Sequence, residues 1–96
     1  MYRDHPAYDY TSVLDASAQF IDVREPDEVA QGTLPGAANI PLGELPGRLH
    51  ELDPDRRVVL LCRSGARSAR AAEVLTNAGF GDVVNLTGGV LVAAQR

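Results

Sequence analysis

The sequence predicts an α/β fold of three layers, in which helices cover both faces of a central parallel sheet of about four to five short strands. Apolar runs at residues 19–23, 57–62 and 83–86 have the length and composition of buried strands. Segments with helix start and stop signals lie between these runs. Strands that alternate with helices at this spacing pair in parallel through right-handed crossovers.

The length of the chain limits its organisation to a single domain, residues 1–96. A chain of 96 residues buries roughly two thirds of the surface that its unfolded form exposes, enough for one sheet and a few helices. Its apolar stretches reach only about five residues, whereas a membrane span needs roughly 20, so we expect no membrane partner. Residues 1–6 lack the apolar core of a secretory signal, and we therefore expect a cytoplasmic protein.

The first part of the chain is predicted to contain two short helices and one strand. Hydroxyl caps followed by an acid indicate a helix start at residues 11–15. The run QFIDV at residues 19–23 predicts a strand. A proline and two acids in a first turn, with Gly32 as the stop, predict the second helix at residues 26–31.

The middle of the chain is predicted to lead into a central strand. A Pro-Gly turn followed by another proline makes residues 33–41 a connection with one brief strand. Residues 46–52 predict a helix, and a turn at residues 53–55 leads into the strand at residues 57–62.

The last part of the chain contains the clearest helical pattern. Apolar positions at residues 68–78 follow an i, i+3, i+4, i+7 stripe, and Gly79 provides a C-terminal stop. The strand at residues 83–86 then leads through a double glycine into a short apolar tail at residues 90–94.

Two independent signals predict a functional site at the carboxyl edge of the sheet. In open parallel sheets, ligands bind beyond the carboxyl ends of the strands. Cys62 ends one apolar run, and Asp22 and Arg24 end another. The segment after Cys62 is small, cationic and rich in turn formers, and it precedes the clearest helix.

Cys62 is predicted to be a reactive thiolate. A free thiol titrates near roughly pH 8.5, and a helix N-terminus with neighbouring cations lowers its pKa. Gly65 adopts a positive φ without steric cost and Ser64 is small, so successive N–H groups can turn inward as an anion-binding nest. Such a nest stabilises a thiolate, a persulfide or an oxyanion. The alternative, an inert cysteine at the end of a core strand, does not account for the flanking arginines.

The charge distribution favours a small anion as the ligand. The net charge is −4, and all nine cations are arginines. Arg63, Arg67 and Arg70 cluster just after the cysteine, whereas a nucleic acid partner would favour a broad basic face. His5, in a mobile N-terminal arm, and His50 have no metal-ligand partner at useful spacing. We expect both to be surface residues, and we expect no metal, cofactor or nucleic acid.

Four motifs extend over most of the chain: IDVREPDE at 21–28, GTLPGA at 32–37 with NIP at 39–41, CRSGARS at 62–68, and AGF at 78–80 with LTGG at 86–89. Together they resemble the motifs of the rhodanese-like sulfurtransferases. Each motif alone is weak, whereas the four in the family's order and spacing are highly specific. The resemblance implies an α/β fold around a parallel sheet. It also implies a cysteine that accepts sulfane sulfur as a persulfide and passes it to cyanide or a thiol.

The length of the cysteine loop separates sulfur transfer from phosphoryl transfer. Phosphatases of the same fold resemble Cys-x5-Arg, a loop that encircles a phosphoryl group. Here the arginine comes one residue sooner, as Cys62-x4-Arg67, and Ser68 takes the position of the phosphatase arginine. The shorter loop resembles the sulfurtransferase type, which disfavours a cysteine phosphatase or an arsenate reductase.

The resemblance implies a double displacement at Cys62. The thiolate attacks the outer sulfur of a donor such as thiosulfate, sulfite leaves, and an acceptor takes the sulfur from the persulfide. The chain has one cysteine, so this acceptor must be an outside partner. The residues predicted to bind the substrate are Arg63, Ser64, Gly65, Ala66, Arg67 and Ser68. The two arginines would attract the anionic donor, and the alternative for both is solvated loop charge.

Asp22 and Arg24 are predicted to support the site rather than to contact the substrate, because a strand-end acid and arginine commonly pair with each other or cap a helix. Arg70 is predicted to face solvent. The sequence departs from the family at Thr33, where histidine is usual, and in the tail at residues 90–94, which lacks a tryptophan. These departures leave the donor preference open.

A second hypothesis comes from a different functional class. The chain would be a persulfide relay, or a non-catalytic sulfur-binding module, that serves a protein partner. A catalyst forms thiocyanate in steady state from thiosulfate and cyanide. A relay carries stoichiometric persulfide yet turns over slowly with small donors.

Overall fold

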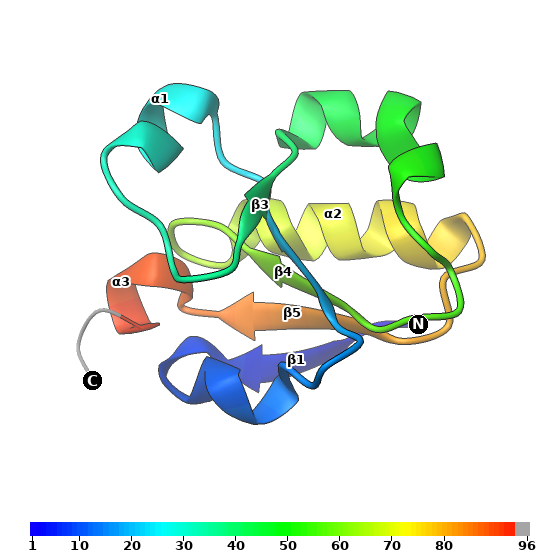
Figure 1. The fold of residues 1–96 in the computed structure, drawn as a ribbon, viewed down its shortest axis with the longest axis horizontal. Helices are drawn as coiled ribbons and strands as arrows, with labels where there is room; N and C mark the ends of the chain where they lie inside the picture. The colour runs from blue at the N-terminus through cyan, green and yellow to red at the C-terminus, as the bar shows by residue number, and fades with distance from the viewer. Residues whose placement is uncertain (94–96) are drawn as a thin grey trace.

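A five-stranded parallel sheet forms the centre of the molecule in the computed structural model, which describes residues 1–93 (Figure 1). In spatial order, the strands are β1 (Arg3–Pro6), β5 (Val83–Thr87), β4 (Val58–Leu61), β2 (Gln19–Asp22) and β3 (Ala38–Asn39). Every neighbouring pair is parallel. The predicted fold class, with about four to five short parallel strands, is confirmed.

Helical segments cover both faces of this sheet, as predicted. They are η1 (Ala7–Val13), α1 (Pro26–Ala30), η2 (Leu42–Glu51), α2 (Ala66–Asn77) and α3 (Gly89–Ala93), of which η1 and η2 are 3-10 helices. In Figure 1, α2 and η2 lie on one face, and η1 lies on the other, in contact with α3. Within residues 1–93, no helix has the length and apolarity needed to cross a membrane.

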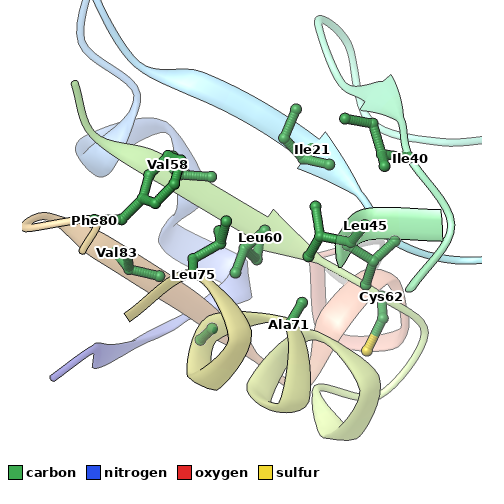
Figure 2. Packing of buried hydrophobic residues seen from close by; sticks show 12 residues of the cluster. Ile21, Ile40, Leu45, Val58, Leu60, Cys62, Ala71, Leu75, Phe80 and Val83 are labelled. Atoms are coloured by element: carbon green, nitrogen blue, oxygen red, sulfur yellow. The ribbon is translucent and has the colours of Figure 1, made fainter. Parts of the chain in front are cut away.

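Side-chain alternation along β4 divides the core into two clusters. Val58, Leu60 and Cys62 belong to the cluster under α2 and η2, whereas Val59 and Leu61 belong to the cluster under η1 and α3. Both faces of this strand are buried, which explains its continuous apolar sequence. Figure 2 shows the first cluster and places Cys62 at the carboxyl end of β4, with its sulfur turned towards α2.

The predicted strands and the clearest helix form with small shifts at their ends. The runs at residues 19–23, 57–62 and 83–86 are β2, β4 and β5, and the helical stripe at residues 68–78 lies within α2 and its C-cap. The helix begins two residues earlier than predicted, because Gly65 at its N-cap has a φ of 105° and turns the chain directly into the first helical turn.

The helix predicted at residues 26–31 is α1, which ends one residue earlier. The two remaining predicted helices are longer than expected and have 3-10 geometry. The segment at residues 11–15 overlaps the end of η1, and the segment at residues 46–52 overlaps η2. Pro46 lies inside η2 and has no N–H to donate, which limits regular α-helical bonding there. Sequence periodicity locates such segments but does not distinguish a kinked 3-10 helix from an α-helix.

The predicted mobile arm at the N-terminus is instead strand β1, so that prediction was wrong. Its residues are polar and include a proline, and β1 is an edge strand that pairs only with β5. His5 is half-buried rather than a free surface residue. Its Nε2 lies 3.0 Å from Ser12 Oγ and 3.1 Å from Asp9 Oδ2.

The apolar tail after the double glycine forms α3, which the sequence analysis did not predict; Ala94 lies outside the described residues. The N–H of Val90 donates to the carbonyl of Cys62 at 3.0 Å, and the N–H of Leu91 donates to that of Arg63 at 3.2 Å. Gly89 permits this contact, because its φ is 57° and a Cβ there would overlap both carbonyl groups.

We expect Gly89→Ala to destabilise the fold by at least about 2 kcal/mol more than Gly79→Ala. Both glycines have positive φ, so both variants carry about 1 kcal/mol of backbone strain. Only Gly89 packs against backbone, since a Cβ at Gly79 meets no atom within 4 Å. Urea unfolding measures the difference. Equal losses in the two variants would contradict the role of this close approach.

Candidate active site

The loop after β4 turns its backbone back towards the sulfur of Cys62. The sulfur accepts hydrogen bonds from the N–H groups of Gly65, at 3.1 Å, and of Ser68, at 3.3 Å. The hydroxyl oxygen of Ser68 also lies 3.3 Å from it. These donors belong to the end of the loop and the first turn of α2, whose N-terminus therefore faces the sulfur.

This arrangement lowers the pKa of the Cys62 thiol below its ordinary value. Burial opposes the shift and is the largest single influence, because the residue is only 1% exposed. Hydrogen bonds from the hydroxyl and N–H of Ser68, and then from the N–H groups of Gly65 and Ser64, lower the pKa by more. The sulfur is therefore a thiolate in a larger fraction of molecules near neutral pH than an ordinary cysteine is.

Ser68 connects the sulfur to a series of polar side chains that runs from the buried hydroxyl to the exposed Asp4 on edge strand β1. Its hydroxyl donates to Asn85 Oδ1 at 2.5 Å, and Asn85 Nδ2 donates to Asp4 Oδ1 on β1 at 3.0 Å. A serine has a single hydroxyl hydrogen, so donation to Asn85, donation to the carbonyl of Gly65 at 3.2 Å and donation to the sulfur are alternatives. The sequence analysis did not predict this series of hydrogen bonds. Its only signal was a polar residue, Asn85, inside an apolar strand.

Asp22 and Arg24 form a buried ion pair at the end of β2. The guanidinium Nη2 lies 2.8 Å from Asp22 Oδ2, and it also donates to the carbonyl of Gly32 at 2.7 Å. Thr33, the departure from the family pattern, donates its hydroxyl to Asp22 Oδ2 at 2.7 Å. The pair therefore anchors the connection between α1 and β3 to the sheet edge.

Arg67 is paired with a residue that sequence reasoning did not include, Glu28 of α1. The two guanidinium nitrogens lie 2.6 and 2.9 Å from the two carboxylate oxygens. The hydrogen bond from Arg67, followed by one from the N–H of Glu25, lowers the pKa of Glu28 to about 2. In the sequence, Glu28 was recognised only as an acid in the first turn of a helix. That role accounts for its place in α1 and gives no indication that it pairs with Arg67.

Arg63 differs from Arg67 in its surroundings. It is exposed, and among residues 1–93 no hydrogen bond or ion pair of its guanidinium is found. It lines a pocket of about 310 Å³ at the carboxyl edge of the sheet, together with Arg24, Glu28, Gln31, Gly32 and Val90. The structure thus brings Arg63 to the same pocket as Arg24 and leaves its charge available to an anion.

The remaining sequence candidates lie apart from this pocket or contribute through their backbone. Ser64 and Ala66 are exposed, and the N–H of Ser64 is the part that acts on the sulfur. Arg70 is exposed and lines a different hollow beside Leu42. Within the described residues, no group of three or more histidines, cysteines or acids is arranged to hold a metal.

The fold and this site together define an α/β protein that holds a cysteine with a lowered pKa at the carboxyl edge of a parallel sheet. The description of the family model that matches residues 8–92 is Rhodanese-like domain. The chain therefore belongs to the rhodanese-like domain family, a family of sulfurtransferases, as its motifs implied.

Several proteins, one of them of known structure, are similar to this chain. A sulfurtransferase of Allochromatium vinosum is 45% identical over 76 residues, which cover 79% of this chain and 71% of that protein. A putative sulfurtransferase of Bacillus subtilis, YtwF, is 42% identical over 77 residues, covering 80% and 74%. The crystal structure of a rhodanese-like domain protein from Staphylococcus aureus superposes with a TM-score of 0.85 at 28% identity, covering 95% of this chain and 90% of that one.

We expect Ser68→Ala to raise the pKa of Cys62 and to reduce the thiolate fraction at neutral pH several-fold. The variant removes the hydroxyl that stabilises the charged sulfur, while burial of the sulfur continues to oppose ionisation. A pH titration of the ultraviolet absorbance of the thiolate measures the shift. Ser64→Ala is the matched control, because it retains the N–H that acts on the sulfur. An unshifted titration in Ser68→Ala would contradict this role of the hydroxyl.

Proposed function

We propose that this chain is a sulfurtransferase that moves sulfane sulfur from a small anionic donor such as thiosulfate through a Cys62 persulfide to cyanide or a thiol. The observation that carries the proposal is the ring of donors around one buried sulfur, which includes the N–H groups of Gly65 and Ser68 and the hydroxyl of Ser68. A thiolate and a terminal persulfide sulfur are both anionic, so the same donors stabilise the reactant and the intermediate.

In the first step, the thiolate of Cys62 forms a bond to the outer sulfur of thiosulfate. The sulfur–sulfur bond of the donor breaks, and its electron pair leaves with sulfite. In the second step, cyanide or a thiolate acceptor attacks the outer persulfide sulfur, and the electron pair of that bond returns to Cys62. No oxidant or reductant is consumed, which agrees with a chain that has one cysteine.

Different groups of the loop bind different parts of the donor. The N–H groups of Ser64, Gly65 and Ser68 hold the reacting sulfur, and Ala66 offers no bulk that would block the turn. Arg63 attracts the anionic donor to the pocket. Asp22 and Arg24 hold the sheet edge in place without contacting the reacting sulfur.

The names of two relatives bear on the choice between the two candidate functions, and the first supports thiosulfate as donor. The thiosulfate sulfurtransferase PspE of Escherichia coli is 37% identical over 75 residues, covering 76% of this chain and 72% of that protein. The putative sulfur carrier protein YrkF of Bacillus subtilis is 38% identical over 76 residues, but the match covers only 41% of that longer protein. The second name favours the alternative candidate, a persulfide relay between protein partners.

We expect wild-type protein, incubated with thiosulfate, to gain the mass of one sulfur atom at Cys62. It should also form thiocyanate when cyanide is added, and Cys62→Ser should lose both signals because an alkoxide does not form at neutral pH. Intact-mass spectrometry and a thiocyanate assay provide the two readouts. Persulfide without sustained thiocyanate formation would identify the relay, and the absence of both signals with wild-type protein would overturn sulfur transfer altogether.

We expect Arg63→Ala to lower kcat/KM for thiosulfate by roughly 5- to 150-fold, which corresponds to about 1–3 kcal/mol for a charge-assisted contact. Arg70→Ala is the matched control, because it removes an exposed arginine seven residues further along that lines a different hollow. Its kcat/KM should stay at the wild-type value. Equal effects of the two substitutions would show that only the overall positive charge attracts the donor.

A further inference from the structure

The orientation of the Asn85 side-chain amide is fixed from two sides. Asn85 of β5 pairs with Asp4 of β1 in the sheet, and its Nδ2 donates to Asp4 Oδ1 at 3.0 Å. Its Oδ1 accepts from the Ser68 hydroxyl of α2 at 2.5 Å. A carboxylate only accepts hydrogen bonds, so the amide must present its nitrogen to Asp4 and therefore its oxygen to Ser68. Figure 1 shows β5 between β1 and β4, with α2 above these strands.

Three acceptors compete for the single hydrogen of the Ser68 hydroxyl. Asn85 Oδ1 is the nearest, at 2.5 Å, while the carbonyl oxygen of Gly65 lies at 3.2 Å and the sulfur of Cys62 at 3.3 Å. When the hydrogen points to Asn85, the hydroxyl oxygen turns its lone pairs towards the sulfur, which suits a thiol that donates its own S–H. A thiolate has no hydrogen to donate. Charge on the sulfur therefore favours a turn of the hydroxyl away from Asn85.

This exchange of partners is unfavourable for Asn85, because it takes place out of contact with water. Asn85 is 3% exposed, and Ser68 is fully buried. Within residues 1–93, the Ser68 hydroxyl is the one side-chain donor found for Asn85 Oδ1. A buried acceptor that loses its donor is destabilising. Asn85 and the Cys62 sulfur therefore compete for the same hydrogen.

We propose that Asn85, held in orientation by Asp4, is a positioning residue that withholds the Ser68 hydroxyl from the Cys62 sulfur until that sulfur carries charge. The role of this device in the reaction rests on the sulfurtransferase function proposed above. The hydroxyl faces the thiolate of the free protein and returns to Asn85 when the charge moves to the outer sulfur of the persulfide. It turns to Cys62 again as the acceptor takes the outer sulfur. Each turn is a rotation of the hydroxyl, and no O–H bond breaks.

The other charged side chains near the sulfur are constant in the variants that test this proposal. They are Arg63 of the loop, Arg67 of α2, which is electrostatically coupled to Cys62, and the Asp22–Arg24 pair at the end of β2. On β1, Asp4 is the charged residue that contacts Asn85. A change of thiolate titration in these variants therefore reports on Asn85, Asp4 or the hydroxyl between Asn85 and the sulfur.

The first test removes the competing acceptor. We expect Asn85→Val to lower the midpoint of the Cys62 thiolate titration, followed by ultraviolet absorbance, by roughly 0.5–1 pH unit. Valine suits a buried strand and has no polar atom to hold the hydroxyl. A merely structural effect would loosen the hydrogen bonds to the sulfur and move the midpoint upwards, towards that of an ordinary cysteine. In a Ser68→Ala background, where no hydroxyl remains, Asn85→Val should leave the midpoint unchanged.

The second test releases the amide from its orientation. Asp4 is exposed, so Asp4→Ala retains the fold even where Asn85→Val does not. Water in place of the carboxylate can donate or accept, so the Asn85 amide is free to turn its Nδ2 towards Ser68. The hydroxyl then donates to the sulfur, and the titration midpoint should again fall. The lost negative charge contributes to this fall by itself, and that part persists in a Ser68→Ala background, whereas the part due to the hydroxyl disappears.

The outcomes separate this inference from the proposed function. Midpoints that rise or stay in place, or shifts of equal size with and without the Ser68 hydroxyl, would overturn the positioning role. In protein that forms thiocyanate, the acid limb of kcat/KM for thiosulfate should move with the titration midpoint, and a limb that stays in place would overturn the role in the reaction. Failure of wild-type protein to form either persulfide or thiocyanate would overturn the sulfurtransferase function, while the titrations, which need no donor, would still decide whether Asn85 withholds the hydroxyl.

Discussion

The hydrogen bonds that the Cys62 sulfur accepts are the interaction on which the rest of the site depends. The sheet buries this sulfur almost completely, and burial alone would make the thiol harder to ionise. Hydrogen bonds from Ser68, Gly65 and Ser64, all within six residues of the cysteine, outweigh burial and lower the pKa of the thiol. The fold supplies the conditions for this reversal. A buried parallel strand fixes the sulfur at its carboxyl end, and a glycine with positive φ lets α2 begin almost immediately.

The length of the loop decides which side chain faces the sulfur. Since α2 begins at Ala66, Arg67 is the second helical residue and turns towards Glu28, whereas Ser68 is the third and turns towards the sulfur. A loop one residue longer, of the Cys-x5-Arg type, would give the position of Ser68 to arginine. A hydroxyl and two N–H groups suit a single polarisable sulfur, while a guanidinium suits the several oxygens of a phosphoryl group. The spacing read in the sequence therefore has a direct geometric meaning.

Sequence predicted those parts of the structure that local patterns determine. The apolar runs predicted β2, β4 and β5, and the helical stripe predicted α2. These elements are visible in the sequence because the residues that face the core must be apolar, which gives strands and helices their characteristic spacing of apolar residues. Strand β1 was missed because its hydrogen bonds come from β5, which lies about eighty residues away in the chain. Glu28 and Asn85 were missed because their partners also lie far away in the sequence. Glu28 is an acid in the first turn of α1, and its contact with Arg67 exists only in the folded chain. Asn85 is a strand residue, and its contact with Ser68 likewise exists only in the folded chain.

The ion pair between Arg67 and Glu28 links helices α1 and α2, and water reaches both side chains in part. Ion pairs that water can reach contribute little net stability and weaken as salt rises, so an incoming anion can displace Glu28 from Arg67. The charge beside the cysteine loop therefore changes when an anion binds there. The position of α3 is less adjustable, because Val90 and Leu91 are tied by backbone hydrogen bonds to the carbonyls of Cys62 and Arg63. An anion that displaces Glu28 would thus pair with Arg67 beside a helix that is fixed to the loop.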